Sequence, residues 1–396
     1  MNTAKKILHP VMRAWIRVTC YFFFDEIHIT GQENIPNDGP VIVASNHPDS
    51  FLDALLITAF YKRSLHYLAR GDVFSSPFVS KILRFLNIVP IFRREEGTEN
   101  LSKNDATFSF CLETFKEDGS ILIFSEGGST NEWNLRTLRK GTARLAYSAW
   151  KDNTIAEKLT VLPVSINYSS WLSAKNTVYL SFQPIIESKQ INTTIEQPVA
   201  LKRFNDILKE KLAENCVIID KSAEQENQKI LSAFFLKNLI NGREVLLRML
   251  ESLKKGDAQT KNNVVELATY LKENKISYLK RSSFATFLLC GILYNLAFVF
   301  NCVPYLLSRR VSKVATNMDE FYDSVLFCVL LFLYPIYLAI LFIVMYFIFH
   351  SFLLGAMLIA LTLLTAKLGE WAKGNIQGYL KRAHYDKVKV LTEKFL

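Results

Sequence analysis

The first residues of this sequence that could do chemistry are His47 and Asp53, in the stretch VIVASNHPDSFLDALL (41–56). The histidine follows an apolar run typical of a buried strand. The aspartate lies inside a second apolar run, where a carboxylate needs a partner. On a straight helix the two side chains would diverge by roughly 240°, but Pro48 suits the first turn of a helix and would bend the chain between them. A histidine oriented by a carboxylate is typical of a general base.

Other interpretations of this pair stay open at this stage. His47 could be a structural histidine with Asp53 facing solvent. Asp49 is a second candidate partner for the ring, although its position suits an acid in the first turn of a helix. Ser45 and Ser50 flank the pair, yet no Gly-x-Ser-x-Gly motif is present. A base without an enzyme nucleophile suits deprotonation of a substrate hydroxyl, which then attacks an activated acyl group.

A second cluster ends the stretch IVPIFRRE (88–95) with Arg93 and Arg94. Paired arginines at the end of a strand can hold a phosphate by forked hydrogen bonds. They could equally be surface charges that pair with Glu95 and Glu96. The first interpretation makes this cluster a candidate phosphate site.

A third cluster lies in ILIFSEGGSTNEWNLRTLRKG (121–141), where a buried run ends and a glycine-rich turn begins. Adjacent glycines let the backbone approach a ligand closely. Lys140 opens the next expected helix, whose amino end could help hold an anion. The candidate site residues of this cluster are Glu126, Gly127, Gly128, Ser129 and Lys140.

Alternating strands and helices must position these clusters. Residues 26–45 read as two strands joined by a Pro/Asn/Gly turn. Further strands are expected at 87–92, 120–125 and 159–168, and helices at 51–62, 76–86, 104–117 and 139–150. This order predicts an α/β domain with a mostly parallel sheet flanked by helices. In such sheets, sites form beyond the ends of the strands.

Composition divides the 396 residues into further regions. Residues 1–25 carry Arg13 and Arg17 on one helical face beside aromatic residues, which is typical of an interfacial helix, although a packing helix fits as well. The α/β domain is expected over 26–200, and a charged helical region over 201–282. A membrane region is expected over 283–368, and a basic tail over 369–396.

Two uncharged runs lie within the membrane region. Residues 324–366 are long enough for a hairpin of two spans joined near His350 and Ser351. Residues 284–308 have Lys and Arg on both flanks, which favours a re-entrant or in-plane segment over one clean crossing. This topology predicts that the catalytic domain and the tail lie on the cytoplasmic face.

The net charge and the cysteine pattern bear on which ligands the protein could bind. The net charge of +10 suits an anionic substrate, a membrane surface or nucleic acid. Nucleic-acid binding is disfavoured, because the basic residues are spread out and no aromatic-basic platform is present. The six cysteines form no Cys-x-x-Cys pair and no His/Cys cluster, so reduced thiols are expected rather than a metal site.

Taken in order, these stretches resemble the blocks of the glycerophospholipid acyltransferase family, whose first motif is His-x4-Asp. NHPDSFLD resembles the first block, IVPIFR the second, FSEGGS the Phe-Pro-Glu-Gly block, and VLPVSINY the fourth, over about residues 30–170. The first block here has five intervening residues, Ser125 replaces the family proline, and Gly128-Ser129 replace Thr-Arg. These differences and LRKGTARLA (138–146) look more like the branch that acylates glycerol 3-phosphate or dihydroxyacetone phosphate.

The resemblance implies a role for each candidate residue. His47 would be the general base on the acceptor hydroxyl, Asp53 would orient it, and Arg93 would bind the acceptor phosphate. The residues that would shape the acceptor pocket or assist there are Glu126, Gly127, Gly128, Ser129 and Lys140. The donor would be acyl-CoA or an acyl carrier protein, and no cofactor or metal is required.

The expected function is therefore membrane-bound O-acyl transfer from an acyl thioester to glycerol 3-phosphate or dihydroxyacetone phosphate in phospholipid biosynthesis. Its partners would be the thioester donor, a phosphorylated glycerol-type acceptor and the lipid bilayer. One alternative is sn-2 acylation of lysophosphatidate or another lysolipid. An alternative of another class is a non-catalytic lipid-binding membrane protein, which the presence of both His47 and Asp53 opposes.

Overall fold

The computed structural model describes residues 3–92, 103–172, 174–191, 195–219, 224–238, 242–277 and 279–395. The chain forms two compact units. Unit 1 comprises residues 1–15, 28–167 and 179–216, and unit 2 comprises residues 16–27, 168–178 and 217–396. The candidate site residues lie in unit 1, and the apolar helices lie in unit 2.

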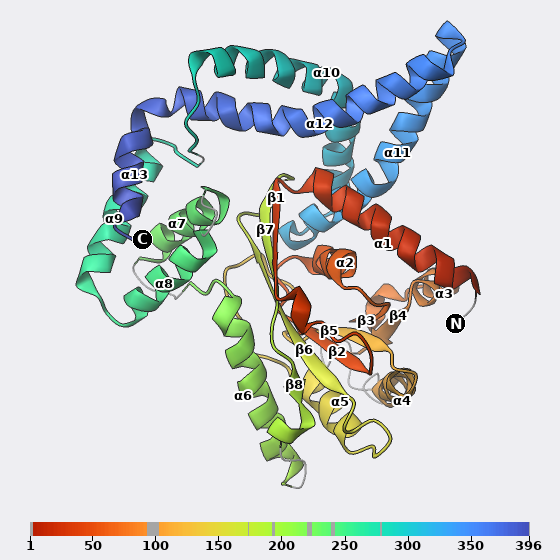
Figure 1. The fold of residues 1–396 in the computed structure, drawn as a ribbon. Coiled ribbons are helices and arrows are strands. Elements are labelled where there is room, and N and C mark those ends of the chain that lie inside the picture. Colours follow the sequence, from red (N-terminus) through yellow and green to blue (C-terminus); the bar gives the residue numbers. More distant parts are fainter. Residues whose placement is uncertain are drawn as a thin grey trace. The chain divides into compact units, whose positions relative to one another are not determined.

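An eight-stranded sheet is the framework of unit 1 (Figure 1). Its strands are β1 (Glu26–Thr30), β2 (Val41–Ser45), β3 (Leu65–Arg70), β4 (Ile88–Ile91), β5 (Ser120–Phe124), β6 (Thr160–Tyr168), β7 (Thr177–Phe182) and β8 (Ile186–Glu187). The order in the sheet is β1-β7-β6-β2-β5-β3-β4, with β8 beside β6. Strand β2 is parallel to β5 and β6, and β3 is parallel to β4 and β5. The expected α/β domain with a mostly parallel sheet is confirmed.

The sheet contains three strands that the sequence did not predict, and the connection between its first two strands is longer in space than expected. Strands β3, β7 and β8 were not predicted. The two strands expected within residues 26–45 are present as β1 and β2, but they are not neighbours in the sheet, because β7 and β6 lie between them. The Pro/Asn/Gly segment is therefore a connection that crosses the sheet, with a short 3-10 turn at Gln32–Asn34.

Four helices of unit 1 begin and end within a few residues of the expected positions: α2 (Ser50–Phe60), α3 (Pro77–Phe85), α4 (Lys103–Lys116) and α5 (Lys140–Trp150). Helix α6 (Gln197–Asn215) follows them, in a part of the chain where helices were expected without definite bounds. Helix α3 shows the local chemistry most directly. The Ser76 hydroxyl accepts the Val79 N–H at 3.2 Å and Pro77 follows it, which is the usual arrangement of a capped helix start.

The core of unit 1 lies around its central strands. Every residue of β2 is buried, as expected for a parallel strand covered on both faces. At the end of α2, Tyr61 is fully buried and its hydroxyl lies 2.8 Å from the Ser120 hydroxyl at the start of β5. Burial raises the pKa of Tyr61, an effect that the hydrogen bond to Ser120 opposes. This packing fixes the strand ends from which the candidate site is built.

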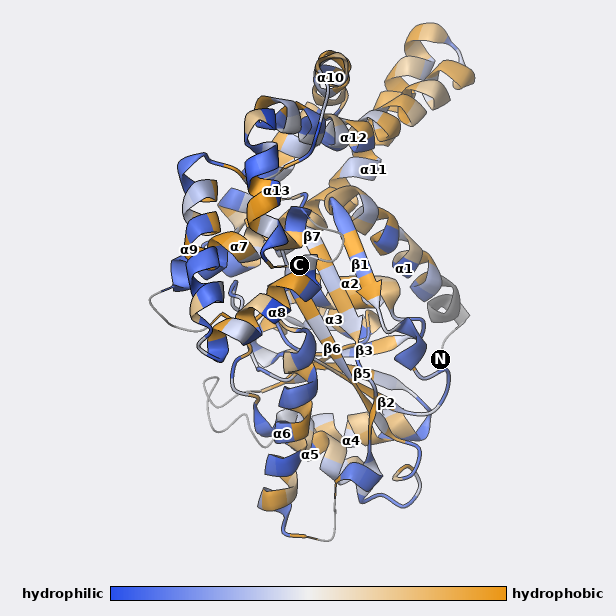
Figure 2. Ribbon diagram, turned by 60° about the vertical axis from the view of Figure 1, so that its left-hand side comes forward, coloured by the Kyte–Doolittle hydropathy of each residue, from blue (hydrophilic) through white to orange (hydrophobic). Residues whose placement is uncertain are grey.

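Unit 2 is helical over most of its length. Helix α1 (Thr3–Phe23) runs from unit 1 into it. The other helices are α7 (Gln225–Asn238), α8 (Gly242–Lys254), α9 (Ala258–Glu273), α10 (Phe284–Ala315), α11 (Tyr322–Phe349), α12 (Phe352–Leu380) and α13 (Tyr385–Glu393). Among the described residues, three helices are long and apolar enough to cross a membrane: Phe284–Ala315, Asp319–Phe349 and Phe352–Leu380. Their hydropathy stands out in Figure 2, and they associate the chain with a membrane.

The break between the two later helices lies at His350 and Ser351. His350 has a positive φ of 49°, and the Ser351 hydroxyl accepts the Leu354 N–H that begins α12. Helix α10 runs without a break from Phe284 to Ala315, although it contains Pro304. The expectation of a re-entrant or in-plane segment over residues 284–308 stays a prediction.

A polar cluster joins the three apolar helices. The Asn301 side chain of α10 donates to the Thr362 carbonyl at 3.4 Å and to the Thr365 hydroxyl at 3.3 Å on α12. The Tyr334 hydroxyl of α11 donates to the Asn301 carbonyl oxygen at 2.6 Å. The Tyr337 hydroxyl donates to the Phe300 carbonyl at 2.8 Å. Such bonds hold helices together where hydrophobic burial cannot, since lipid is itself apolar.

Candidate functional site

The turn after β2 is tied to the neighbouring strand before it reaches His47. The Asn46 side chain donates to the Ile166 carbonyl at 2.9 Å and accepts the Ile166 N–H at 2.8 Å. Both bonds are buried, and they continue the pairing between β2 and β6 by one residue. The backbone that presents His47 is therefore held rigidly at the carboxyl edge of the sheet, where sites of α/β folds usually lie.

His47 and Asp53 form a direct pair. The Nδ1 atom of His47 lies 2.8 Å from the Oδ2 atom of Asp53, whose side chain is fully buried. The same oxygen accepts the backbone N–H of Asp49 at 2.8 Å. Asp53, not Asp49, is thus the carboxylate on the ring, and the Asp49 backbone helps to fix it. With Nδ1 donating to the carboxylate, Nε2 carries the free lone pair that a base needs.

The His47 ring is also fixed from its face. It stacks on Phe124, with the ring centroids 3.7 Å apart and the planes 6° from parallel. Phe124 ends β5 and is paired with Ser45 of β2, so the sheet register brings the two rings together. The histidine side chain is 14% exposed, which leaves its outer edge open to a substrate.

Glu126 fastens the glycine-rich turn to the backbone of His47. Its Oε2 atom accepts the His47 N–H at 2.9 Å, and its Oε1 atom accepts the Arg136 N–H at 2.8 Å. The Arg136 guanidinium donates to Oε2 at 3.2 Å and also to the Gly128 carbonyl. The Thr130 N–H donates to the His47 carbonyl at 3.3 Å. The turn therefore holds both backbone polar groups of His47.

The two glycines of the turn meet different requirements. Gly127 has a φ of 74°, and a Cβ atom there would lie 2.9 Å from the Arg139 Cγ atom, so a side chain is excluded. Gly128 contributes its carbonyl to Arg136. The Ser129 carbonyl accepts the Thr130 hydroxyl at 2.8 Å. Lys140 is the first residue of α5 and its side chain is exposed, so it follows the turn but takes no part in its hydrogen bonds.

The structure brings most of the predicted site residues into one region of unit 1. His47, Asp53 and Glu126 are linked by hydrogen bonds, and the residues from Gly127 to Ser129 follow directly. Arg93 lies outside the described residues. The roles of all these residues remain predictions.

Arg136 and Phe124 were missed by the sequence analysis. Phe124 looked like an ordinary core residue at the end of a strand. Arg136 lies in a polar stretch without a recognisable motif, ten residues after Glu126. Only its Nη2 atom bonds to protein among the described residues, so Nε and Nη1 can still donate to an anion. The signal that could have found Arg136 is a buried glutamate that needs a cation.

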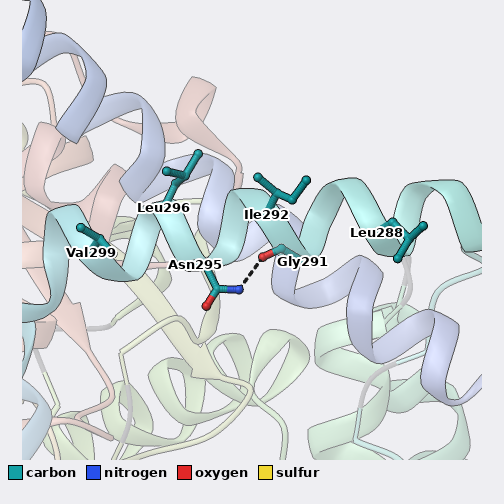
Figure 3. Close-up of a pocket in the computed structure, with 6 residues that line it drawn as sticks. All are labelled: Leu288, Gly291, Ile292, Asn295, Leu296 and Val299. Carbon is teal, nitrogen blue, oxygen red and sulfur yellow. Dashed lines mark hydrogen bonds between the residues drawn. The ribbon is translucent and has the colours of Figure 1, made fainter.

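Two hollows of the surface are lined by other residues. A shallow apolar groove of about 440 Å³ runs along α10, between Leu288 and Val299, where the Asn295 amide donates to the Gly291 carbonyl at 2.8 Å (Figure 3). A second hollow of about 790 Å³ lies where β2, β5 and β6 begin, at the edge of the sheet opposite His47. Among the described residues no group of three or more His, Cys, Asp or Glu could hold a metal ion.

Comparison with known proteins matches the Acyltransferase family model to residues 26–167. The match contains β2, the turn with His47, and the turn with Glu126. It ends at Asn167, so it leaves out the apolar helices.

The chain is also similar to curated proteins. A chloroplastic 1-acyl-sn-glycerol-3-phosphate acyltransferase of Arabidopsis thaliana is 28% identical over 143 residues, which are 36% of this chain and 38% of that protein. A 1-acyl-sn-glycerol-3-phosphate acyltransferase of Borreliella burgdorferi is 26% identical over 184 residues, 45% of this chain and 68% of that protein. The chain thus spans less than two fifths of the length of the plant relative.

The chain is also similar in fold to a solved structure. It is the 1-acyl-sn-glycerophosphate acyltransferase PlsC of Thermotoga maritima, with 22% sequence identity and a TM-score of 0.40. The alignment covers 53% of this chain and 80% of that one.

Proposed function

We propose that this chain is a member of the glycerophospholipid acyltransferase family, to which it is similar, and that it transfers an acyl group from a thioester to the free hydroxyl of lysophosphatidate. The observation that carries acyl transfer is the bond between His47 Nδ1 and Asp53 Oδ2, which leaves Nε2 as a base at the open edge of the ring. The choice of acceptor is supported by the two similar curated proteins, which are both 1-acyl-sn-glycerol-3-phosphate acyltransferases.

The chemistry follows from this pair. Nε2 of His47 takes the proton of the acceptor hydroxyl while that oxygen attacks the thioester carbonyl carbon. Asp53 stabilises the imidazolium that forms. The tetrahedral intermediate then expels the thiolate by breaking the C–S bond, and the imidazolium returns its proton to the sulfur. The histidine ends neutral, so each turnover starts from the same state.

We assign Glu126 a positioning role rather than direct contact with the acceptor. Its two carboxylate oxygens already accept from the His47 backbone, the Arg136 backbone and the Arg136 guanidinium. The acceptor phosphate would instead bind the remaining donors of Arg136, since a guanidinium suits phosphate oxygens. Arg93 is a second proposed contact for the phosphate.

Glycerol 3-phosphate or dihydroxyacetone phosphate is the second candidate acceptor, because two sequence features favour it. The five residues between His47 and Asp53 and the Glu126-Gly127-Gly128-Ser129 sequence resemble the branch that acylates glycerol 3-phosphate or dihydroxyacetone phosphate. The same base would act on either acceptor, because the reacting group is a hydroxyl in each case. The donor is acyl-CoA or acyl carrier protein, and we propose that the catalytic unit lies on the cytoplasmic face of the membrane.

The test is thiol release by the purified full chain in lipid vesicles. The donors are acyl-CoA and acyl carrier protein, and the acceptors are lysophosphatidate, glycerol 3-phosphate, dihydroxyacetone phosphate and lysophosphatidylcholine. We expect lysophosphatidate to react fastest and His47→Ala to lower the rate by about 10²–10⁴-fold. If glycerol 3-phosphate reacted faster than lysophosphatidate, glycerol 3-phosphate would be the acceptor. Lipid binding without any acyl transfer would favour the non-catalytic alternative.

A further inference from the structure

Helix α3 of unit 1 has no buried side chain, although it is strongly amphipathic in sequence. Phe78 is 73% exposed, Ile82 43% and Phe85 45%. A surface helix of a globular domain normally turns its apolar stripe towards the core. Here the largest apolar side chains point outwards. A contiguous exposed apolar surface of this kind marks an interaction site.

Basic residues flank these apolar side chains. Phe78, Ile82 and Phe85 follow the i, i+4, i+7 spacing of one helical face, and Lys81 and Arg84 beside them are exposed. Helix α3 contains no acidic residue. Val73, in the turn before the helix, is 44% exposed. We call the set of these six residues the α3 patch.

The α3 patch begins at the same edge of the sheet as the candidate site. Strand β3 is parallel to β4 and β5, and β5 is parallel to β2. The turn with Val73 follows the carboxyl end of β3, just as His47 follows β2 and Glu126 follows β5. Strand β4, which follows α3, is the last strand of the sheet on that side. The patch therefore lies on an outer part of unit 1 that no further strand covers.

The first half of α1 extends this surface. The Asn87 side chain, just past the end of α3, lies 3.4 Å from the Nε2 atom of His9 on α1. Further along α1, Val11 is 59% exposed and Trp15 39%, four residues apart and so on one face. Two helices that meet at His9 and Asn87 thus both expose apolar and aromatic side chains.

We infer that the α3 patch docks unit 1 onto an anionic lipid surface, with Phe78, Ile82 and Phe85 among the acyl chains near the headgroups. Lys81 and Arg84 lie where they would meet lipid phosphates. The charge complementarity favours anionic lipid over a protein partner, and the apolar helices of unit 2 already hold the chain at a bilayer. The inference does not depend on the acyl acceptor or on catalysis.

Docking of the α3 patch would keep the candidate site close to the membrane surface. A lipid-facing patch at the carboxyl edge of the sheet holds this edge beside the bilayer, where a lipid substrate or product can pass without crossing water.

The experiment places an environment-sensitive fluorescent amino acid at position 78 of the full chain in vesicles of phosphatidylcholine and phosphatidylglycerol. The matched control places it at position 199, because Val199 on α6 is also exposed, at 53%, but stands apart from the patch. We expect the fluorophore at position 78 to be shielded from aqueous iodide and quenched by nitroxide-labelled lipid. The fluorophore at position 199 should show the opposite behaviour.

The charge dependence provides a second readout. Lys81→Glu with Arg84→Glu should lower the ratio of shielded to exposed fluorophore by about fivefold for each positive charge removed. Lys202→Glu with Lys209→Glu on α6, both exposed residues, should leave it unchanged. Iodide quenching at position 78 equal to that at position 199 would overturn the inference. Shielding from iodide without quenching by labelled lipid would also overturn it, because protein would then cover the patch.

Discussion

The Nδ1 atom of His47 lies 2.8 Å from the Oδ2 atom of Asp53, although five residues separate them in the chain. That oxygen also accepts the Asp49 N–H, so the acid is fixed by the backbone while it fixes the ring. Phe124 stacks on the ring and Glu126 holds its backbone. The ring that we propose as the base is thus preorganised, with Nε2 at its outer edge.

Replacing Asp53 by Asn should lower kcat by about 10²–10⁴-fold. The Asn amide can donate to Nδ1, which would place the ring proton on Nε2 and remove the lone pair that acts as the base. His47→Ala should have an effect of the same order. The measurement is thiol release at saturating donor and acceptor.

The control for both variants is His28→Ala, because His28 belongs to edge strand β1 and stacks on Tyr179 outside the site. It should keep kcat within a few-fold of the parent value. If Asp53→Asn retained full turnover with a normal unfolding temperature, the assignment of the base would be wrong.

Glu126→Gln should destabilise the glycine-rich turn by about 1–3 kcal/mol. A glutamine presents an N–H₂ group where one carboxylate oxygen now accepts, so the N–H of His47 or of Arg136 loses its acceptor. We expect a lower thermal unfolding midpoint and a fall in kcat larger than any change in KM. Glu113→Gln on α4 is the matched control, because Glu113 is 71% exposed and pairs with Lys116 at the surface. An unchanged unfolding midpoint and kcat would contradict the positioning role.

Arg136→Gln should raise the KM of a phosphorylated acceptor by about ten- to hundredfold, the range for a lost hydrogen bond to a charged group. The KM of the thioester donor should stay the same. Turnover of a monoacylglycerol, which lacks the phosphate, should not depend on this residue. The matched control is Arg144→Gln, an exposed arginine on α5. Equal acceptor KM values for the parent and Arg136→Gln would exclude a phosphate contact.

Tyr334→Phe should destabilise the membrane helices by about 0.6 kcal/mol, and by no more than about 1.7 kcal/mol. The substitution removes only the hydroxyl that donates to Asn301. Unfolding of the full chain in detergent by a denaturant would measure it. Tyr346→Phe is the control, since Tyr346 is 44% exposed on the same helix. Equal stability of the two variants would show that the Asn301 cluster adds nothing measurable.

Cys20 and Cys111 should resist alkylation in the folded protein at pH 8.5. Burial raises the pKa of each thiol from 9.0 to about 12, so both stay protonated there. The unfolded thiols ionise near pH 9.0, so raising the pH above that value favours unfolding. Mass spectrometry after iodoacetamide treatment should find both peptides unmodified until denaturant is added. Modification of Cys111 in the folded chain would contradict the burial described here.

The sequence was sufficient for the alternation of strands and helices and for the His47–Asp53 pair. Apolar runs such as β2 and β6 are fully or almost fully buried, and proline or serine marks the start of α3. Strand β3 was missed because LHYLAR mixes polar and apolar residues and lies half-exposed near the edge of the sheet. Strand β7 was missed because a short, fully buried run has no diagnostic period.

The partners of Glu126 could not be predicted for a different reason. Its contacts with the His47 backbone and with Arg136 depend on how the turn closes in space, and sequence spacing does not encode that closure. The alternative of Asp49 as the ring partner needed coordinates as well. Local chemistry therefore indicated which groups were present, and tertiary structure decided which of them meet.

Ser50 is buried with a φ of 41°, a left-handed conformation that is unusual for serine, at the first residue of α2. This left-handed residue lies between His47 and Asp53, before the regular helix turns the carboxylate back to the ring. Five intervening residues are therefore compatible with a direct bond between the two side chains. A pattern search that demands a fixed interval between histidine and aspartate would overlook chains that build the same dyad through such a kink.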